Sequence, residues 1–380
     1  MNRDALRWGT AAWLVLRLVT LLAAFSIRFL DPGPSPEVPG YRPPELTGLT
    51  GEIAGPWLRA DALWYLKVAT QGYAKDDGTL AFFPAFPALT WVVNQAIGNE
   101  AIAGLVAANL AGWAGLILLF AFVQLLVDSK AAKATVLGVA LFPTAFFFVA
   151  PYGEPMLLAA GSAGLLFALK GKNGACFAAG VIAALSRPFG AAIALPMAAI
   201  VSQGKGWRRW IGPMGPLVGL GAWALYAWRL TGDPMALIDI QGNWQRELTP
   251  FWGTLTAGVR TWRDWSGTEY GSYYLFDLAA TLFGLSLIPL VVLAVRARAP
   301  KRTIIGYGLA AYGIAALAVP LSLPFLPRPM MSNPRFVLAL FPIFLGLVVL
   351  HGKARIVLAG ASAIGLFVGT LVYLAGRPLF

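Results

Sequence analysis

The chain has 380 residues, of which 58% are hydrophobic and only 12% are charged. Soluble domains carry about 25% charged residues, so the composition excludes an ordinary soluble domain and indicates an all-α polytopic membrane protein. A single cysteine, Cys176, excludes an intrachain disulfide and a cysteine-based metal cluster, and a single histidine, His351, excludes a multi-histidine metal site. The net charge of +12 raises the question of a nucleic-acid partner, which the placement of the basic residues answers.

Eleven segments are predicted to cross a membrane, because a spanning helix needs about 20 mostly apolar residues. They lie near 8–30, 101–127, 134–150, 155–170, 174–186, 188–202, 210–231, 276–295, 303–323, 335–350 and 355–375. The first follows MNRDALRWG without a small-residue cleavage site, so it is predicted to be a retained helix rather than a signal peptide. Residues 1–380 are expected to form one integral membrane domain.

The basic residues predict the orientation of these segments. If the N-terminus is cytoplasmic, 15 of the 29 Lys and Arg residues fall in six short inward turns, as the positive-inside rule requires. These residues are Arg3, Arg7, Lys130, Lys133, Lys170, Lys172, Lys205, Arg208, Arg209, Arg296, Arg298, Lys301, Arg302, Lys353 and Arg355. The basic excess is therefore explained by topology, and no nucleic-acid partner is expected.

The long connections all fall on the predicted outer side, at 31–100, 232–275 and 322–334. Long loops in a compact membrane domain are usually functional or disordered, and the many Trp and Tyr residues argue against disorder. For the later basic turns to stay inside, the apolar segment 81–98 must not cross the membrane. It is predicted to be a re-entrant or interfacial helix of the first outer loop.

Four features of this outer face have polar chemistry, and charged groups at such depth are costly unless they are paired or functional. They are Asp61 with its neighbours Arg59, Trp64 and Tyr65; Tyr152 and Glu154 at the end of a span; Arg187 in SRPFG; and Arg335 in NPRF.

Each feature also has a simpler interpretation. Asp61 is compatible with an interfacial helix whose carboxylate faces water, and Glu154 with a helix cap. Arg187 and Arg335 are compatible with snorkelling side chains. Asp76 and Asp77 form no D-x-D motif and are interpreted as the solvated tip of a polar turn. The convergence of two arginines and two carboxylates on one face favours a functional site.

The same segments resemble the PIG-V family, the GPI mannosyltransferase 2 group and its bacterial relatives. LRADALWYLKVATQGY followed by FFPAFP is similar to the family's first outer loop, and FPTAFFFVAPYGEPMLL to its second, with Glu154 at the acidic position. SRPFG, NPRFVLALFP and TGDPMALIDIQGNW are similar to three further family elements, the last of which ends at Gln241 and Trp244. Ala60 and Phe189 depart from the family pattern.

The resemblance implies a GT-C-type fold with about eleven transmembrane helices, amphipathic or re-entrant helices in the first outer loop, and a polyprenyl-phosphate-linked sugar as donor. The implied reaction is an inverting displacement in which Asp61 takes the acceptor proton, with Glu154 as its acidic partner. Arg187 and Arg335 would bind the donor phosphate, without cofactor or metal. The implied substrate contacts are Arg59, Trp64, Tyr65, Tyr152, Gln241 and Trp244.

The implied function is a glycosyltransferase, first of all a mannosyltransferase, with a lipid or glycan acceptor. The protein would lie in a bacterial plasma membrane with its site facing outside. A transporter or flippase of a lipid-linked sugar is the alternative. Transporters often have duplicated halves and midplane sites, and neither is evident in this sequence.

Overall fold

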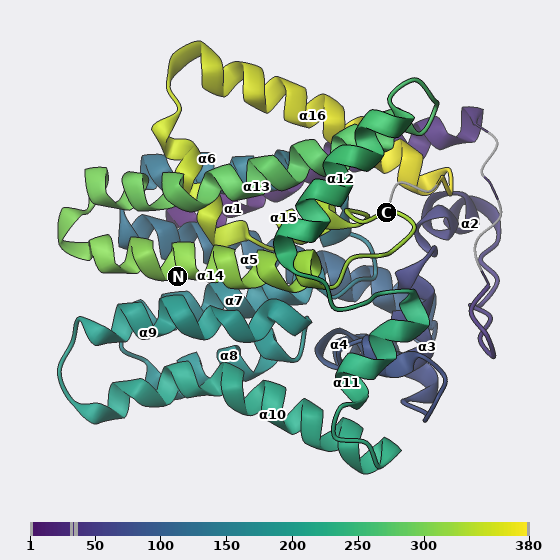
Figure 1. Cartoon of the computed structure of the whole chain (residues 1–380), viewed down its shortest axis with the longest axis horizontal. Coiled ribbons are helices and arrows are strands. Elements are labelled where there is room, and N and C mark those ends of the chain that lie inside the picture. Colours follow the sequence, from purple (N-terminus) through teal and green to yellow (C-terminus); the bar gives the residue numbers. More distant parts are fainter. Residues whose placement is uncertain (1–2, 31–32, 34–36, 378–380) are drawn as a thin grey trace.

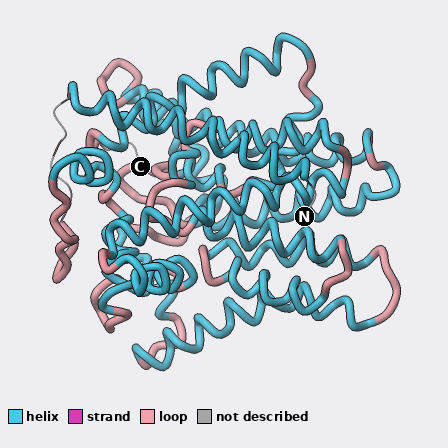
Figure 2. The backbone as a smooth tube through the Cα atoms, turned by 180° about the vertical axis from the view of Figure 1, so that it is seen from behind, coloured by secondary structure: helices cyan, strands magenta, loops and turns pink. Residues whose placement is uncertain are grey.

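The computed structural model describes residues 3–30, 33 and 37–377. The predicted domain and its first outer loop also include 1–2, 31–32, 34–36 and 378–380, which lie outside the described residues. In the part of the chain that is described, regular structure consists of α-helices and short 3-10 helices, with two isolated β-bridges. Figure 1 shows that most of the long helices lie side by side with their axes roughly aligned. Figure 2 shows from behind that the loops gather at the two ends of this bundle.

The α-helices are α1 Arg3–Ser26, α2 Gly48–Ala54, α3 Asp61–Gln71, α4 Ala85–Ile97, α5 Glu100–Leu126, α6 Ser129–Leu141, α7 Glu154–Leu169, α8 Asn173–Ala184, α9 Ala194–Ser202, α10 Ile211–Thr231, α11 Ala236–Asp239, α12 Phe251–Trp265, α13 Gly271–Arg298, α14 Thr303–Ser322, α15 Asn333–Leu338 and α16 Gly352–Leu374. Among the 3-10 helices, η4 spans Ala145–Phe148, η5 Pro188–Ile193, η7 Ile240–Trp244 and η9 Phe341–Val349.

Five helical segments of the described chain are long and apolar enough to cross a membrane, by length and composition. They are Arg3–Phe29, Glu100–Leu126, Gly271–Arg298, Pro300–Ser322 and Gly352–Leu374. Three further apolar segments, Glu154–Leu169, Asn173–Ala184 and Pro188–Ser202, are shorter. Exposed Leu, Ile, Val and Phe side chains along α1 and α16 are typical of lipid-facing helices. These features indicate an integral membrane protein, and the number eleven stays a prediction.

Two of the predicted spans are not continuous helices. In 134–150, α6 ends at Leu141, because Phe142 precedes Pro143 and adopts ψ 140°, outside the helical region. The chain then continues as η4, whose four residues are all buried. In 335–350, the six-residue α15 is followed by η9, which begins beside Pro342. Both broken segments lie inside the bundle, where protein rather than lipid surrounds their backbone.

The segment 81–98 contains α4, a helix of 13 residues. At 1.5 Å per residue such a helix is about 20 Å long, shorter than a hydrocarbon core of about 30 Å. Its first residue, Ala85, donates its N–H to the carbonyl of Leu185, 2.9 Å away, just beyond the end of α8. The length of α4 therefore agrees with an interfacial or re-entrant helix, which stays a prediction.

Several of the predicted inner turns meet at one end of the bundle. Lys133 Nζ lies 3.9 Å from the centre of the Trp8 ring, and this contact connects the N-terminal parts of α1 and α6. Arg298 forms an ion pair with Asp128 at 3.0 Å, and Arg302 donates to the carbonyls of Leu125 and Leu126. Basic side chains from two turns are thus gathered beside the start of α1, at the end where Figure 1 shows the α13–α14 connection.

This arrangement predicts the result of cysteine labelling. We expect Lys205→Cys and Pro300→Cys to resist a membrane-impermeant thiol reagent in intact cells and to react after lysis. Lys75→Cys, an exposed position in the turn after α3, serves as the outward control and should react before lysis. The native Cys176 is buried, so we expect a low background. Labelling of positions 205 and 300 before lysis would contradict the orientation.

Candidate functional site

The four charged residues singled out in the sequence come together in the structure. Arg335 Nη1 lies 2.6 Å from Asp61 Oδ2, and Arg335 Nε lies 3.4 Å from Glu154 Oε1. Glu154 Oε1 also lies 3.1 Å from Arg187 Nη2. The four side chains therefore form one continuous ionic chain, Asp61–Arg335–Glu154–Arg187, across segments that are up to 274 residues apart.

Breaks and ends of helices bring these side chains together. Asp61 and Glu154 are the first residues of α3 and α7, where the helix dipole favours a carboxylate. Arg187 lies between α8 and η5, at the predicted proline break. Arg335 lies in α15, directly after Pro334.

Two backbone positions next to the carboxylates are tightly constrained. Ala60 adopts φ 49°, which a residue with a side chain rarely does. A Cβ at Gly153 would lie 2.7 Å from the Ser186 carbonyl oxygen and 2.8 Å from the Tyr65 hydroxyl. Glycine therefore lets the start of α7 approach the segment of Arg187. Constrained backbone of this kind clusters at functional sites.

The two carboxylates differ in their access to solvent. The Glu154 side chain is 0% exposed, whereas 26% of the Asp61 side chain is exposed. The Asp61 Oδ1 atom makes no hydrogen bond to the described residues, because the contact with Arg335 uses Oδ2. Asp61 is thus the carboxylate that an outside molecule can reach.

Both arginines are buried rather than snorkelling, with 8% and 9% of the Arg187 and Arg335 side chains exposed. The Arg335 guanidinium lies over the rings of Phe147, Tyr152 and Phe336, at 5.4 to 5.5 Å from their centres. Aromatic faces attract cations, and a dry surrounding strengthens each ion pair. The interpretation of these arginines as snorkelling side chains is therefore wrong.

Tyr65 and Tyr152, predicted to touch substrate, are each only 1% exposed. Arg187 Nη1 donates to the Tyr65 hydroxyl at 3.2 Å, and Phe82, Phe86 and Tyr152 surround the Tyr65 ring. The Tyr152 hydroxyl donates to the Arg59 carbonyl at 3.4 Å. In this structure neither ring has a free face for a sugar, because both pack beneath the ionic chain.

Three other predicted contacts lie around this centre. Arg59 is buried, and its Nη1 donates to the Gly33 carbonyl at 2.9 Å rather than to a member of the ionic chain. The Trp64 ring is stacked on the Phe82 ring, with ring centres 5.4 Å apart. The Trp64 and Trp244 rings meet edge to face, with ring centres 5.3 Å apart. Gln241 lies in η7 with Trp244, and its carbonyl accepts the Arg246 N–H.

Arg246 is a member of the site that the sequence analysis missed. Its guanidinium lies 5.9 Å from the centre of the Phe336 ring, and its Nη1 donates to the Leu323 carbonyl at 2.7 Å. Burial lowers the pKa of Arg246 to about 10, and the charge of Arg335 adds to this effect. The available signal was its place in a predicted outer loop, two residues after the predicted contact Trp244.

The segment before Arg335 is anchored by a second buried ion pair. Arg328 Nε lies 2.6 Å from Asp277 Oδ2 on α13, and the Asp277 side chain is almost fully buried. Asn333 Nδ2 donates to Thr281 Oγ1 at 3.0 Å, and Thr144 Oγ1 donates to the Pro334 carbonyl at 2.9 Å. The loop 322–334 is thus held to α13 and to the start of η4, which fixes the position of Arg335.

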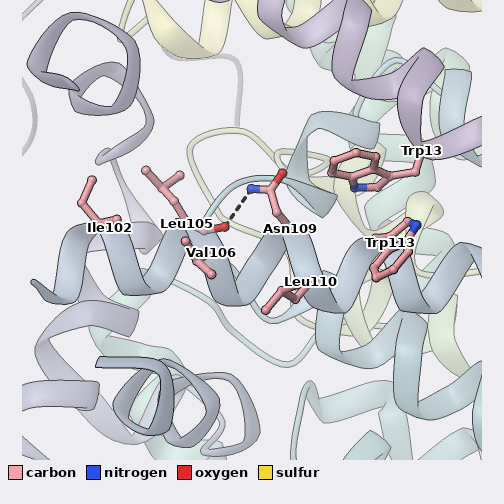
Figure 3. A pocket seen from close by; sticks show the side chains of 7 residues that line it. All are labelled: Trp13, Ile102, Leu105, Val106, Asn109, Leu110 and Trp113. Atoms are coloured by element: carbon pink, nitrogen blue, oxygen red, sulfur yellow. Dashed lines mark hydrogen bonds between the residues drawn. The ribbon is translucent and has the colours of Figure 1, made fainter. Parts of the chain in front are cut away.

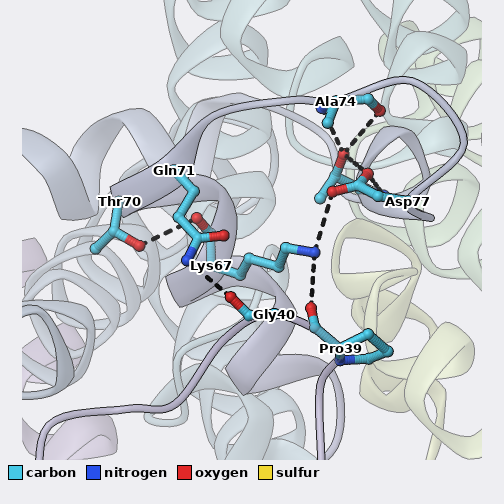
Figure 4. Close-up of polar contacts among 8 residues, drawn as sticks. Pro39, Gly40, Lys67, Thr70, Gln71, Ala74 and Asp77 are labelled. Atoms are coloured by element: carbon cyan, nitrogen blue, oxygen red, sulfur yellow. Dashed lines mark hydrogen bonds and ion pairs between the residues drawn. The ribbon is translucent and has the colours of Figure 1, made fainter.

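Helix α3, which carries Asp61, is anchored by Lys67 (Figure 4). Lys67 Nζ lies 3.0 Å from both Asp77 Oδ2 and the Pro39 carbonyl oxygen. Burial alone would raise the pKa of Asp77, but hydrogen bonds from Thr79 and Lys67 outweigh burial and hold the pKa below its ordinary value. Asp77 is therefore a structural partner of α3, and the interpretation of Asp77 as a solvated tip is wrong.

A cavity of about 370 Å³ lies elsewhere, between α1 and α5 (Figure 3). Its walls are mostly apolar, and none of its lining residues belongs to the ionic chain. Asn109 lies in it and donates to the carbonyls of Leu105 and Val149, at 2.7 and 3.2 Å. The wall lacks the charges that distinguish the cluster around Asp61.

No protein-family model matches the sequence, and no curated protein matches it. Solved structures of the oligosaccharyltransferase of Archaeoglobus fulgidus do show a likeness. The form tethered to an acceptor peptide is 14% identical with a TM-score of 0.44. The matched region covers 97% of this chain and 55% of the oligosaccharyltransferase chain. The archaeal oligosaccharyltransferase AglB with an inhibitory peptide and a dolichol-phosphate is 12% identical with a TM-score of 0.40. The matched region covers 97% of this chain and 56% of the AglB chain. This chain thus spans little more than half the length of those proteins.

The burial of Glu154 predicts a large effect on stability. Glu154→Gln leaves Arg187 and Arg335 partly unpaired in a dry surrounding, and breaking a buried ion pair in this way costs about 3 kcal/mol or more. We therefore expect a clear fall in the melting temperature of the detergent-purified protein. Glu269→Gln, which removes the same charge at an exposed position, should leave the melting temperature unchanged. Equal melting temperatures for both variants would contradict the buried ionic chain.

Proposed function

We propose that the protein is a glycosyltransferase of GT-C type that moves a sugar from a polyprenyl-phosphate donor to a hydroxyl of a lipid or glycan acceptor, with inversion at the anomeric carbon. The observation that carries this proposal is the state of Asp61. It is a partly exposed carboxylate at the exposed end of the ionic chain. Arg335 holds one of its oxygens, and the other oxygen makes no hydrogen bond to the described residues. Mannose is the proposed sugar, because the sequence elements around these residues resemble the PIG-V family.

Asp61 is well placed to act as a general base. The acceptor oxygen would attack the anomeric carbon while its proton passes to the free Oδ1 of Asp61, and the bond between that carbon and the phosphate oxygen breaks. A positioned base of this kind contributes about 10²–10⁴-fold in rate. The ionised carboxylate would also stabilise an oxocarbenium-like transition state. Glu154 is too buried to meet an acceptor, so we assign it to positioning Arg335 and Arg187.

The leaving group would be a lipid phosphate, which needs positive charge rather than a proton donor. Guanidinium groups are suited to phosphate because their planar N–H groups bind two oxygens at once. Arg335 supplies one such group 2.6 Å from Asp61, and Arg187 supplies a second that is paired with the same Glu154 as Arg335. The cluster can therefore compensate the charge that develops on the phosphate.

The place of the cluster in the bundle favours transfer over transport. Glu154 begins α7, whereas the predicted inner residues Lys170 and Lys172 follow its other end. The charged centre is thus at one end of the helices, and transporter sites lie near the middle of the membrane. We propose that this end faces the outside of a bacterial plasma membrane, where a lipid carrier can present its sugar.

Replacement of Asp61 tests this proposal. Asp61→Asn keeps the size of the side chain but cannot take a proton, so we expect turnover to fall by about 10²–10⁴-fold. The assay follows radiolabelled mannose from polyprenyl-phosphate mannose into a lipid extract of the source organism, with purified protein and saturating donor. Asp76→Asn is the matched control, because Asp76 is exposed in a nearby turn where its φ of 63° also suits asparagine.

Near-normal turnover of Asp61→Asn would contradict the role of Asp61 as base. Movement of the labelled lipid across vesicles that contain the protein, with no transfer of mannose, would favour the transporter alternative.

Metal removal gives a further test. Because arginines supply the positive charge at the proposed phosphate site, we expect EDTA to leave turnover within about two-fold of the untreated enzyme. The control is the same treatment followed by excess Mg²⁺ or Mn²⁺, which should not raise the rate. A strict requirement for either ion would contradict an arginine-only phosphate site.

A further inference from the structure

Three guanidinium groups surround one aromatic ring in the site. The centre of the Phe336 ring lies 5.4 Å from the guanidinium carbon of Arg335, 5.7 Å from that of Arg187 and 5.9 Å from that of Arg246. Cations repel one another strongly in a surrounding of low polarity, so such a group of three requires negative charge nearby.

Two of the three arginines already have that charge within the protein. Arg187 is paired with Glu154, and Arg335 is paired with both Glu154 and Asp61. Arg246 has no carboxylate within ion-pair distance in the part of the chain that the structure describes. The hydrogen bond from its Nη1 to the Leu323 carbonyl uses one N–H group and supplies no charge. Three cations and two carboxylates leave one positive charge uncompensated.

This charge persists at neutral pH, and the side chain that carries it is not fully enclosed. Although burial and Arg335 lower the pKa of Arg246 to about 10, the group stays protonated at pH 7. Arg246 is only partly buried, and its Nε and Nη2 atoms make no hydrogen bond to described residues. It therefore has free donors next to a centre that is short of one anion.

The backbone around Arg246 is ordered by contacts with the last outer loop. Arg246 forms an isolated antiparallel bridge with Phe325, and the Leu326 N–H donates to the Gln245 carbonyl at 3.1 Å. Gln245 itself adopts φ 51°. The position of the Arg246 guanidinium is thus set by the two loops 232–275 and 322–334 and does not depend on one flexible tip.

We infer that Arg246 is the residue that binds the phosphate of the lipid-linked substrate, while Arg187 and Arg335 serve mainly as counter-ions of Glu154 and Asp61. This inference rests on the proposed function and refines its phosphate site. The shared chemistry is a phosphate ester on an apolar tail, which an isoprenoid carrier and a membrane phospholipid both offer. A phosphate at Arg246 would complete the charge balance of the site and would lie beside Phe336, close to the Asp61–Arg335 pair.

Binding of undecaprenyl phosphate to the purified full chain tests the inference. We expect Arg246→Gln to weaken binding about 10- to 100-fold, the loss that follows from one or two charge-assisted hydrogen bonds. Arg246→Lys should lose less, since it keeps the charge but not the planar donors. Arg260→Gln is the matched control, because it removes an exposed arginine from the same outer segment and should bind as the wild type does.

Melting temperatures separate a binding defect from misfolding. Without ligand, Arg246→Gln should melt within a few degrees of the wild-type temperature, because it removes an uncompensated charge but also the hydrogen bond to the Leu323 carbonyl. Undecaprenyl phosphate should raise the melting temperature of the wild type and of Arg260→Gln but not that of Arg246→Gln. A rise in the melting temperature of Arg246→Gln with undecaprenyl phosphate as large as that of the wild type would overturn the inference.

Further probes identify the source of the phosphate. Undecaprenol, which lacks the phosphate, should bind equally to the wild type and to Arg246→Gln. Phosphatidic acid and inorganic phosphate should each bind more weakly than undecaprenyl phosphate. An equal loss with phosphatidic acid would support the phosphate contact and assign it to a phospholipid headgroup.

The inference and the proposed function can fail separately. If the wild type transfers mannose and Arg246→Gln binds undecaprenyl phosphate with unchanged affinity, the role of Arg246 is overturned and the function stands. If Arg246→Gln loses that binding but the wild type transfers no sugar, the phosphate contact stands and the transferase function fails.

Discussion

The pairing of Arg335 with Asp61 and Glu154 is the interaction on which the rest of the site depends. One guanidinium holds two carboxylates that would otherwise repel each other, and it lies against the aromatic faces of Phe147, Tyr152 and Phe336. Buried charges are tolerated only when they are paired and enclosed with good geometry. This requirement explains the second ion pair between Arg328 and Asp277, which holds the segment that carries Arg335.

The same requirement separates the roles of the two acids. Glu154 is enclosed between two arginines and stabilises their arrangement, whereas Asp61 lies at the open side with one oxygen free. Helix α3, which carries Asp61, is held by the Lys67–Asp77 pair and by the constrained backbone at Ala60. The proposed sugar transfer rests on this arrangement, in which a partly exposed carboxylate lies next to buried cations.

The helical fold class and the five longest apolar helices were predicted from the sequence, because long apolar runs depend on local composition. The sequence did not predict the interruptions of 134–150 and 335–350, since an isolated proline such as Pro143 is compatible with either a kink or a break. The convergence of Asp61, Glu154, Arg187 and Arg335 was expected from their common place on the predicted outer face. Their pairing was not predicted, because ion pairs depend on distances between remote segments. Arg246 was missed for the same reason: only its approach to Phe336 distinguishes it from other loop arginines.

The most direct measurement is an experimental structure of the protein in lipid nanodiscs with a non-transferable polyprenyl-phosphate sugar analogue. We predict that the anomeric carbon lies within about 6 Å of Asp61 Oδ1, which leaves room for one attacking hydroxyl, and that the ion pairs of Arg335 persist. A sugar phosphate bound at the opposite end of the bundle, near Lys170 and Lys172, would contradict the account. The same is true of a bound state in which Asp61 turns away from the sugar.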